Sequence, residues 1–494
     1  MATDSPRVSP AHARSLRGWL RHLAATDRLA VAREGVSLDY EVAAIAKKLD
    51  GRQAVLFPKP GGNAGGHAGG HSRGHSRGHS ISIVSGYVAA RAWIAEAMGV
   101  PESELLHCFR DSSERPTKWR EIPAAQAPVR QVTVEKPDLL ELLPIPRHSE
   151  HDSAPYITAG VIIARNPKTG AQNVSIQRIQ VKDGRRLQAL ILPRHLSAFH
   201  TMAEEKGEAL PIAIVIGADP LTLLASQAVV PIDHDELEIA GSLHGAPLEV
   251  VKCVGSEIRV PAHAEIVIEA RVLPGVRELE GPFGEFPKTY SPAGQHQVIE
   301  VDRVTHRRNP IFHTIVPAEL EHLMLGAIPR EATILGLLQR SFPNVLDAHL
   351  SLGGTCRYHL YVKMKKRREA EGKNVIMAAF GAHFDLKQVI VVDDDVDVHN
   401  PAEVEWAVAT RFQADRDLIV VSGAQGSPLD PSTTLTGCID GMSAKMGLDA
   451  TRPLTYAGYT FTRVRVPGEE AVDLDKVIDP APKSVIDSLL SEKA

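Results

Sequence analysis

The sequence has few cysteines and no long apolar run. Its 494 residues contain four cysteines, and no two of them form a CxxC pair: Cys108, Cys253, Cys356 and Cys438. This scatter predicts reduced thiols rather than a disulfide framework or a zinc cluster. The first residues have no apolar segment of the kind found in signal peptides, and no apolar run approaches the length of a membrane span. We therefore expect a cytoplasmic protein without membrane association.

The sequence also lacks a strong excess of one charge. The net charge is -5, and 43% of the residues are hydrophobic, as is typical of a globular protein. A basic run at residues 363–373 has the composition of a solvated connection, so we expect no nucleic-acid partner. There is no P-loop, and no Rossmann glycine fingerprint follows a strand.

The patterns that are present predict an α/β protein with three domains. Helical periodicity at residues 11–25 and 40–49, together with short strands, indicates an N-terminal α/β domain over residues 1–125. β-rich runs separated by turn residues predict a barrel or a sandwich over residues 126–309. Strands and helices then alternate over residues 310–494, which predicts a largely parallel sheet followed by a terminal amphipathic helix.

A glycine- and histidine-rich tract interrupts the first domain at residues 61–80. Four of its histidines recur every four residues and could bind a transition metal: His67, His71, His75 and His79. Glycine cannot hold them on one face of a helix, so a flexible, solvated loop is the better interpretation.

Three polar residues of the middle domain could together hold a divalent cation: Asn173 on a predicted strand, His195 at a helix start and Glu236 in the segment DHDELEIAG. His200 and Glu238 compete with His195 and Glu236 for the same role. Arg194 and the helix start beside it would suit a phosphate-bearing ligand. Without further support, an exposed asparagine, a structural histidine and an acidic loop explain the same residues.

The segment ELEGPFGE, residues 278–285, places Glu280 and Glu285 around a Gly-Pro-Phe-Gly turn. Two nearby carboxylates can have separated pKa values, so that one of them donates a proton near neutral pH. Arg178 is the candidate arginine that decides which carboxylate ionises. Such a Glu-Arg-Glu network suits protonation of a carbanion during decarboxylation.

A rival site lies at the end of the run KQVIVVDDDVD. Lys387 precedes a buried strand, and Asp393–Asp395 stand at its carboxyl end, where open α/β sheets place ligands. Adjacent aspartates can hold Mg²⁺ or Mn²⁺ against a diphosphate, so a metal-dependent nucleotide-sugar or nucleotidyl transferase is the alternative function.

Seven motifs occur in a fixed order between about residues 150 and 450: NVSIQR, PRH, DELEIAG, IEARV, ELEGPFGE, KQVIVVDDDVD and SAKMGLDAT. In this combination the chain resembles the UbiD family of prenylated-FMN-dependent (de)carboxylases. The resemblance implies an N-terminal α/β domain, a split β-barrel that binds the flavin, and a C-terminal α/β domain whose last helix forms oligomers. It also implies a homodimer or larger homo-oligomer, and a prenylated-flavin synthase that supplies the cofactor.

The resemblance also implies roles for individual residues. Asn173, His195 and Glu236 would bind Mn²⁺ or Mg²⁺ at the phosphate of prenylated FMN, with K⁺ nearby. Arg178, Glu280 and Glu285 would form the catalytic network, with Glu285 as proton donor. The expected flavin contacts are Asn173, Val174, Ser175, Ile176, Gln177, Arg178, Arg194, His195, Glu236 and Lys387.

The segment after the catalytic turn looks closer to the heteroaromatic branch of the family, which acts on furan-, pyrrole- or indole-carboxylates. His296 and Arg303 could supply a hydrogen bond and a positive charge to a heteroatom or a second carboxylate, although a surface histidine and a strand-edge arginine are equally good interpretations. A non-catalytic subunit of a carboxylase complex is the remaining alternative; it would be expected to have lost an acid or a metal ligand.

Overall fold

The computed structural model describes residues 8–62, 78–433, 441–478 and 482–490. His67, His71, His75 and Cys438 lie outside these residues, as does most of the glycine- and histidine-rich tract. The chain divides into two compact units, Met1–Thr451 and Arg452–Ala494. Across the described residues, no helix has the length and apolar character needed to span a membrane.

The N-terminal region contains a four-stranded sheet in the order β1-β2-β3-β16. Helix α1 buries Leu16, Trp19, Leu20 and Leu23 on one face, as its periodicity predicts, and Ser15 caps its first turn by accepting from Gly18 N–H. The elements of this region are η1 (Ala11–Arg14), α1 (Leu16–Ala25), β1 (Leu29–Val31), α2 (Glu41–Leu49), β2 (Ala54–Phe57), β3 (Ser82–Ser85), α3 (Arg91–Met98), η2 (Glu102–Glu104) and α4 (Leu105–Glu114).

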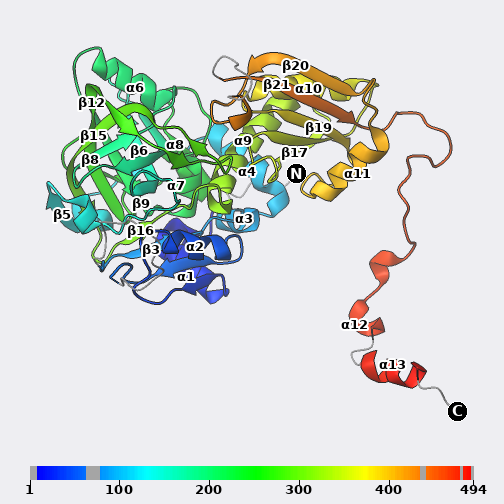
Figure 1. Ribbon diagram of the computed structural model, residues 1–494, viewed down its shortest axis with the longest axis horizontal. Helices are drawn as coiled ribbons and strands as arrows, with labels where there is room; N and C mark the ends of the chain where they lie inside the picture. The colour runs from blue at the N-terminus through cyan, green and yellow to red at the C-terminus, as the bar shows by residue number, and fades with distance from the viewer. Residues whose placement is uncertain (1–7, 63–77, 434–440, 479–481, 491–494) are drawn as a thin grey trace. The chain divides into compact units, whose positions relative to one another are not determined.

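The middle of the chain forms a closed antiparallel barrel, drawn mostly in green in Figure 1. Its strands follow the order β12-β9-β6-β7-β8-β15, and pairing of β12 with β15 closes it, while β5 extends β15. Closure leaves no edge between the first and last strands of the barrel. Alternate apolar side chains of these strands fill its interior, among them Ile162, Ile214 and Ile268.

The elements in and around the barrel are β4 (Arg120–Glu121), η3 (Ala124–Gln126), η4 (Pro128–Arg130), β5 (Val132–Glu135), α5 (Leu139–Leu142), β6 (Tyr156–Arg165), β7 (Gln172–Val181), β8 (Arg186–Ala189), α6 (His195–Glu204), β9 (Leu210–Ile216), α7 (Pro220–Ala225), α8 (Glu236–His244), β10 (Glu249–Lys252), β11 (Arg259–Pro261), β12 (Ile266–Glu280), β13 (Phe283–Gly284), β14 (Tyr290–Ser291) and β15 (Gly294–His306).

The third region is a five-stranded sheet in the order β17-β18-β19-β21-β20. The three central strands are parallel, as predicted, whereas both edge strands pair antiparallel with their neighbours. Figure 1 shows α10 and α11 beside this sheet. The elements from residue 311 to residue 450 are β16 (Ile311–His313), α9 (Leu320–Ser341), β17 (Val345–Leu350), β18 (His359–Met364), α10 (Glu371–Ala382), β19 (Gln388–Asp393), α11 (Pro401–Arg411), β20 (Leu418–Gln425), η5 (Pro431–Thr433) and β21 (Met442–Ala450).

Strand β16 shows that the domains are interleaved in sequence. The sequence pattern placed residues 310–494 in one C-terminal domain, but β16 pairs parallel with β3 of the first sheet. The chain therefore returns to the N-terminal sheet after it has completed the barrel.

The second unit contains η6 (Glu469–Ala471), α12 (Leu474–Val477) and α13 (Pro482–Leu490). The expected terminal helix is present. Its apolar side chains are exposed, including Leu489 at 74% and Leu490 at 75%. Within the described part of the second unit, no other element covers this apolar surface.

Candidate active site

The three residues expected to form the catalytic network meet at one end of the barrel. Arg178 on β7 donates through Nη2 to Oε2 of Glu280 at 2.8 Å, and its Nη1 donates to Glu285. The same Nη1 also donates to Ser291 Oγ at 2.6 Å. A single guanidinium therefore separates two buried carboxylates that lie five residues apart in sequence.

The backbone of the Gly-Pro-Phe-Gly turn holds these carboxylates in place. Gly281 has φ +91°, and an added Cβ would lie 3.2 Å from both Ala293 Cα and Pro292 O. Gly281 N–H donates to Gln180 Oε1 at 3.0 Å, and the Tyr156 hydroxyl lies 3.1 Å from both this oxygen and Glu280 Oε1. The glycine is required both by its conformation and by the close approach of the neighbouring loop.

Burial makes Glu285 a suitable proton donor. Glu280 is fully buried and Glu285 is 9% exposed. Desolvation raises the pKa of Glu285, although the positive charge of Arg178 opposes this effect. A carboxyl group with a raised pKa keeps its proton closer to neutral pH, which general-acid catalysis requires.

Glu285 and Arg178 open onto a cavity of about 180 Å³. Barrel residues Ile176 and Gln177 form part of its wall, as do Phe286 and several residues of α9. The cavity therefore lies where the catalytic turn, the barrel and α9 come together.

The three proposed metal ligands also come together. The Asn173 amide donates to Glu236 Oε1 at 2.8 Å and lies 3.5 Å from His195 Nδ1. Val174 N–H donates to the second oxygen, Glu236 Oε2, at 2.7 Å. Burial raises the pKa of Glu236 to about 8. A buried carboxylate whose described partners are both neutral donors is a suitable environment for a cation.

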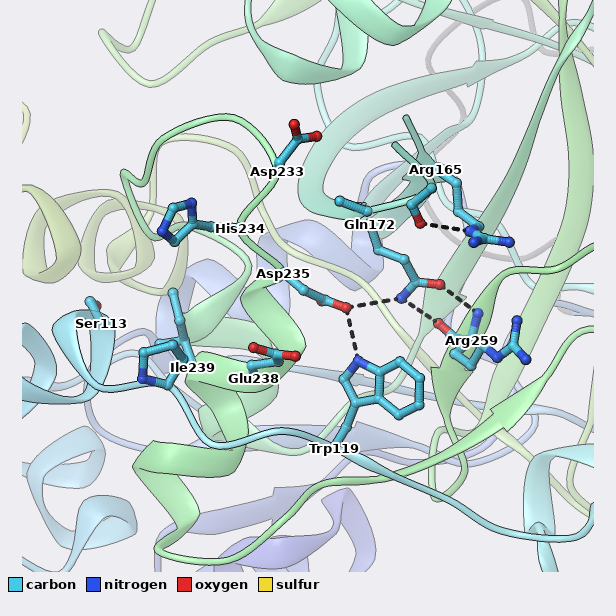
Figure 2. A pocket seen from close by; sticks show the side chains of 13 residues that line it. Ser113, Trp119, Arg165, Gln172, Asp233, His234, Asp235, Glu238, Ile239 and Arg259 are labelled. Atoms are coloured by element: carbon cyan, nitrogen blue, oxygen red, sulfur yellow. Dashed lines mark hydrogen bonds between the residues drawn. The ribbon is translucent and has the colours of Figure 1, made fainter. Parts of the chain in front are cut away.

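Glu236 is the first residue of α8, and the start of this helix places its side chain beside Asn173 and His195. Asp235 caps the helix by accepting from Leu237 N–H at 2.9 Å, and its other oxygen accepts from the Trp119 indole at 2.9 Å. Figure 2 shows the contact between Asp235 and Trp119, in a separate cavity of about 630 Å³ that Glu238 also lines. Glu238, the competing ligand, thus faces a different space from Glu236.

His200, the competing histidine, points toward β12. Its Nε2 lies 3.3 Å from Leu273 O, and Nδ1 lies 4.0 Å from Glu204 Oε2. The structure therefore groups Asn173 with His195 rather than with His200. Ser175 lies further along β7, where its hydroxyl accepts from Gln177 Nε2.

Lys387 and the aspartate run have separate partners. Lys387 Nζ lies 2.7 Å from both Asp430 Oδ2 and Ser432 Oγ. Arg411 donates to Asp393 at 2.7 Å and through both terminal nitrogens to Asp395 at 2.8 and 3.0 Å. Two of the three carboxylates expected to hold a metal in a transferase, Asp393 and Asp395, are thus paired with a buried arginine.

The two residues expected to recognise substrate are in different places. His296 lies beside the catalytic network, with its Nε2 3.8 Å from Glu280 Oε2. Arg303 donates to Glu135 at 3.0 Å and to Glu269 at 3.3 Å on the neighbouring strands. The described residues that line the 180 Å³ cavity include neither of them, so the structure does not bring Arg303 to the site.

Two residues with nitrogen donors, His322 and Arg357, line the cavity instead, and Arg330 lies next to them. Gly326 also lines the cavity, and its carbonyl accepts from buried Arg330. Burial lowers the pKa of both Arg330 and Arg357, and repulsion from Arg194 lowers both further. Burial, with Arg357 and Arg330 nearby, lowers the pKa of His322 to about 3. The sequence segment HLMLGAIPREA contains His322 and Arg330, but its helical periodicity predicts only a half-buried helix and gives no sign of a site.

Matches to family models cover most of the chain. Residues 20–112, 120–320 and 323–450 match the N-terminal, Rift-related and C-terminal domains of 3-octaprenyl-4-hydroxybenzoate carboxy-lyase. The chain belongs to the UbiD family. Membership makes it a decarboxylase, and the closed barrel matches the UbiD fold.

Solved UbiD-class structures are similar over nearly the whole chain. HmfF from Pelotomaculum thermopropionicum, solved in complex with FMN, is 45% identical with a TM-score of 0.88, and the match covers 94% of this chain and 99% of HmfF. The 3,4-dihydroxybenzoic acid decarboxylase of Enterobacter cloacae is 27% identical with a TM-score of 0.83, covering 95% and 98%.

Among UbiD relatives of known activity, an anhydromevalonate phosphate decarboxylase from Methanothermobacter thermautotrophicus is 44% identical over 377 residues. That match covers 76% of this chain and 87% of the relative. The similar proteins thus include enzymes named for different acids.

Proposed function

We propose that this protein uses prenylated FMN to decarboxylate a small unsaturated acid that carries a second anionic group. The observation that carries the proposal is that two sets of polar groups line one cavity. Arg178 and Glu285 form the first set, and His322 and Arg357 form the second. The first set suits proton delivery to carbon, and the second suits an anion.

The donor direction of His322 supports anion recognition. Its Nδ1 accepts from Ala318 N–H at 3.1 Å, so the neutral ring carries its proton on Nε2. Arg330 Nε, among the described residues, has no hydrogen-bond partner although it is buried. A carboxylate or phosphate in the cavity would accept from His322 Nε2–H and from Arg357, which both line it, and would reduce the repulsion among the arginines.

The cofactor would supply the electron sink for loss of CO₂, and the chain would supply orientation and protons. Asn173, His195 and Glu236 would hold Mn²⁺ or Mg²⁺ at its phosphate, with K⁺ nearby. Flavin contacts would come from residues 173–178, Arg194 and Lys387. Arg178 would orient both glutamates, and Glu285 would protonate the substrate carbon. His296 would act through Glu280.

Five-membered heteroaromatic diacids, such as furan-2,5-dicarboxylate and the corresponding pyrrole acids, are the first substrate class to test. Anhydromevalonate phosphate is the second candidate, because a 44% identical relative is named for that activity. Both are unsaturated acids with a second anionic group. We expect the reaction to reverse at high bicarbonate.

The test is co-production with a prenylated-flavin synthase, followed by measurement of CO₂ release from matched acids with and without the second anionic group. Arg357→Met should raise KM for the dianionic acid about tenfold or more and leave the monoanionic acid unaffected, because Arg357 lines the cavity. Arg340→Met, whose side chain is 72% exposed, is the control. Equal turnover of both acids by the wild type, or equal effects of both variants, would refute the proposal that the substrate carries a second anionic group.

A further inference from the structure

A β-bulge lies directly opposite the catalytic arginine. Strand β6 pairs Ile157 with Ile179 and Gly160 with Gln177 of β7, so two residues of β6 face the single residue Arg178. Those two residues are Thr158 and Ala159. Bulges next to active sites redirect a side chain, and Thr158 lines the same cavity as Arg178 and Glu285.

The Thr158 hydroxyl is the end of a buried hydrogen-bond chain. Its Oγ1 accepts from Ile315 N–H at 3.0 Å and lies 3.1 Å from Thr314 Oγ1. Thr314 Oγ1 lies 2.7 Å from His148 Nε2. His148 is 6% exposed, Thr158 8% and Thr314 fully buried.

The position of the proton on the His148 ring determines the direction of the hydrogen bonds that link His148, Thr314 and Thr158. Burial lowers the pKa of His148 to about 3, so the ring is neutral near pH 7 with one proton on either nitrogen. Among the described residues, its Nδ1 is buried without a hydrogen-bond partner. Orphaned buried N–H donors are rare, whereas an unused lone pair is tolerated more readily. The proton therefore belongs on Nε2.

This tautomer sets the direction of the hydrogen bonds. His148 Nε2–H donates to Thr314 Oγ1. Thr158 Oγ1 is the other hydrogen-bond partner of the Thr314 hydroxyl among the described residues, so the buried Thr314 hydrogen is satisfied only when it is donated to Thr158. Since Thr158 Oγ1 already accepts from Ile315 and Thr314, its own hydrogen points away from both partners. With the proton on Nδ1, the order would reverse, and Thr158 would present a lone pair to the cavity.

We propose that Thr158 is a hydrogen-bond donor in the reaction cavity and that His148, acting through Thr314, is the positioning residue that sets this polarity. The recipient is an acceptor atom of the bound flavin or of the substrate. The inference extends the proposed function but does not depend on its substrate class. Asp152 supports the arrangement, because it accepts from Ser149 N–H at 2.8 Å and from Gly284 N–H at 3.1 Å and so ties the His148 segment to the catalytic turn.

The first test is the tautomer itself, measured by ¹⁵N NMR of imidazole-labelled protein, with His148→Gln used to assign the signal. We expect a neutral ring protonated at Nε2 throughout pH 5–9. A ring protonated at Nδ1, or an imidazolium, overturns the proposal without any activity measurement.

The second test uses FMN alone as the probe. If the flavin is the recipient, Thr158→Val should weaken FMN binding about tenfold, and Thr158→Ser should restore it. If the substrate is the recipient, FMN affinity should be unchanged while kcat/KM of the loaded enzyme falls about tenfold in Thr158→Val alone. Wild-type values of both quantities in Thr158→Val would refute the donor role.

The link to His148 is tested by a double-mutant cycle. His148→Phe should reproduce part of the Thr158→Val effect, and the double variant should be no worse than Thr158→Val. Additive effects would show that His148 does not act through Thr158. His151→Phe, at an exposed position of the same segment, is the control that should leave binding unchanged.

Discussion

At the scale of single residues, the environment of Glu285 accounts for its chemistry. Desolvation raises the pKa of this carboxyl, so it remains protonated to higher pH than a solvated glutamate, and Arg178 limits the shift. The rate of the wild-type enzyme should therefore fall as pH rises through this elevated pKa.

We expect Glu285→Gln to retain FMN binding and lose about 10²–10⁴-fold in turnover, because an amide fills the same space but cannot deliver a proton. Glu278→Gln is the control on the neighbouring strand, where the carboxylate accepts from Gln188 at 2.9 Å. CO₂ release and a flavin absorbance spectrum measure the two properties. Normal turnover by the flavin-loaded Glu285→Gln variant would show that Glu285 is not the proton donor.

Individual residues also show the limit of what the sequence predicts. Residue types and local order were enough to nominate Arg178, Glu280 and Glu285, which the structure brings together. Arg303 was nominated on sequence proximity alone, and its partners Glu135 and Glu269 stand on flanking strands whose register no local pattern encodes. The cluster of His322, Arg330 and Arg357 was missed for the same reason, since Arg357 reaches the cavity from beyond the end of α9.

At the scale of elements, the turn after β12 is the most constrained segment of the site. Gly281 and Gly275 both have positive φ, but an added Cβ meets backbone at Gly281 and nothing within 4 Å at Gly275. Gly281→Ala should lower the free energy of unfolding by about 1–3 kcal/mol through strained backbone and crowding. It should also weaken activity by displacing Glu280.

Gly275→Ala is the matched control, and it should cost only about 1 kcal/mol from the backbone conformation. Urea denaturation followed by circular dichroism compares the two variants. Equal destabilisation would show that contact with Ala293 and Pro292 does not constrain the turn.

The end of β19 provides an independent test of the transferase alternative. Arg411 is the buried partner of Asp393 and Asp395, so Arg411→Met should destabilise the protein by about 3–5 kcal/mol by leaving carboxylates uncompensated. FMN affinity should not change. Arg416→Met, at an exposed ion pair with Asp417, should cost less than about 1 kcal/mol. Unchanged stability of Arg411→Met would indicate that the aspartates have another role.

At the scale of the whole molecule, the exposed apolar side chains of the second unit predict self-association. Leu489→Glu with Leu490→Glu should reduce the molar mass measured by light scattering, because charge opposes burial of this surface between copies. The control Lys483→Glu changes charge at the start of the same helix. A mass identical to that of the wild type would show that α13 does not mediate assembly.

The hydrophobic pattern, which is a local property, was enough to predict α/β regions at both ends and a β-rich middle region. It did not distinguish a barrel from a sandwich, and the barrel was implied by the resemblance to the UbiD family. The position of β16 could not be predicted from a local pattern, because its parallel pairing with β3 joins segments more than 200 residues apart. A three-residue strand has too little pattern to reveal its partner.

That pairing also sets an order of events during synthesis. Strand β3 ends at Ser85, and β16 begins at Ile311, so the ribosome must make the whole barrel before the first sheet can gain its fourth strand. At about 5–20 residues per second, this interval is roughly 10–45 s. Throughout it, β3 presents one unpaired backbone edge to its surroundings, where another nascent chain or a chaperone can reach it.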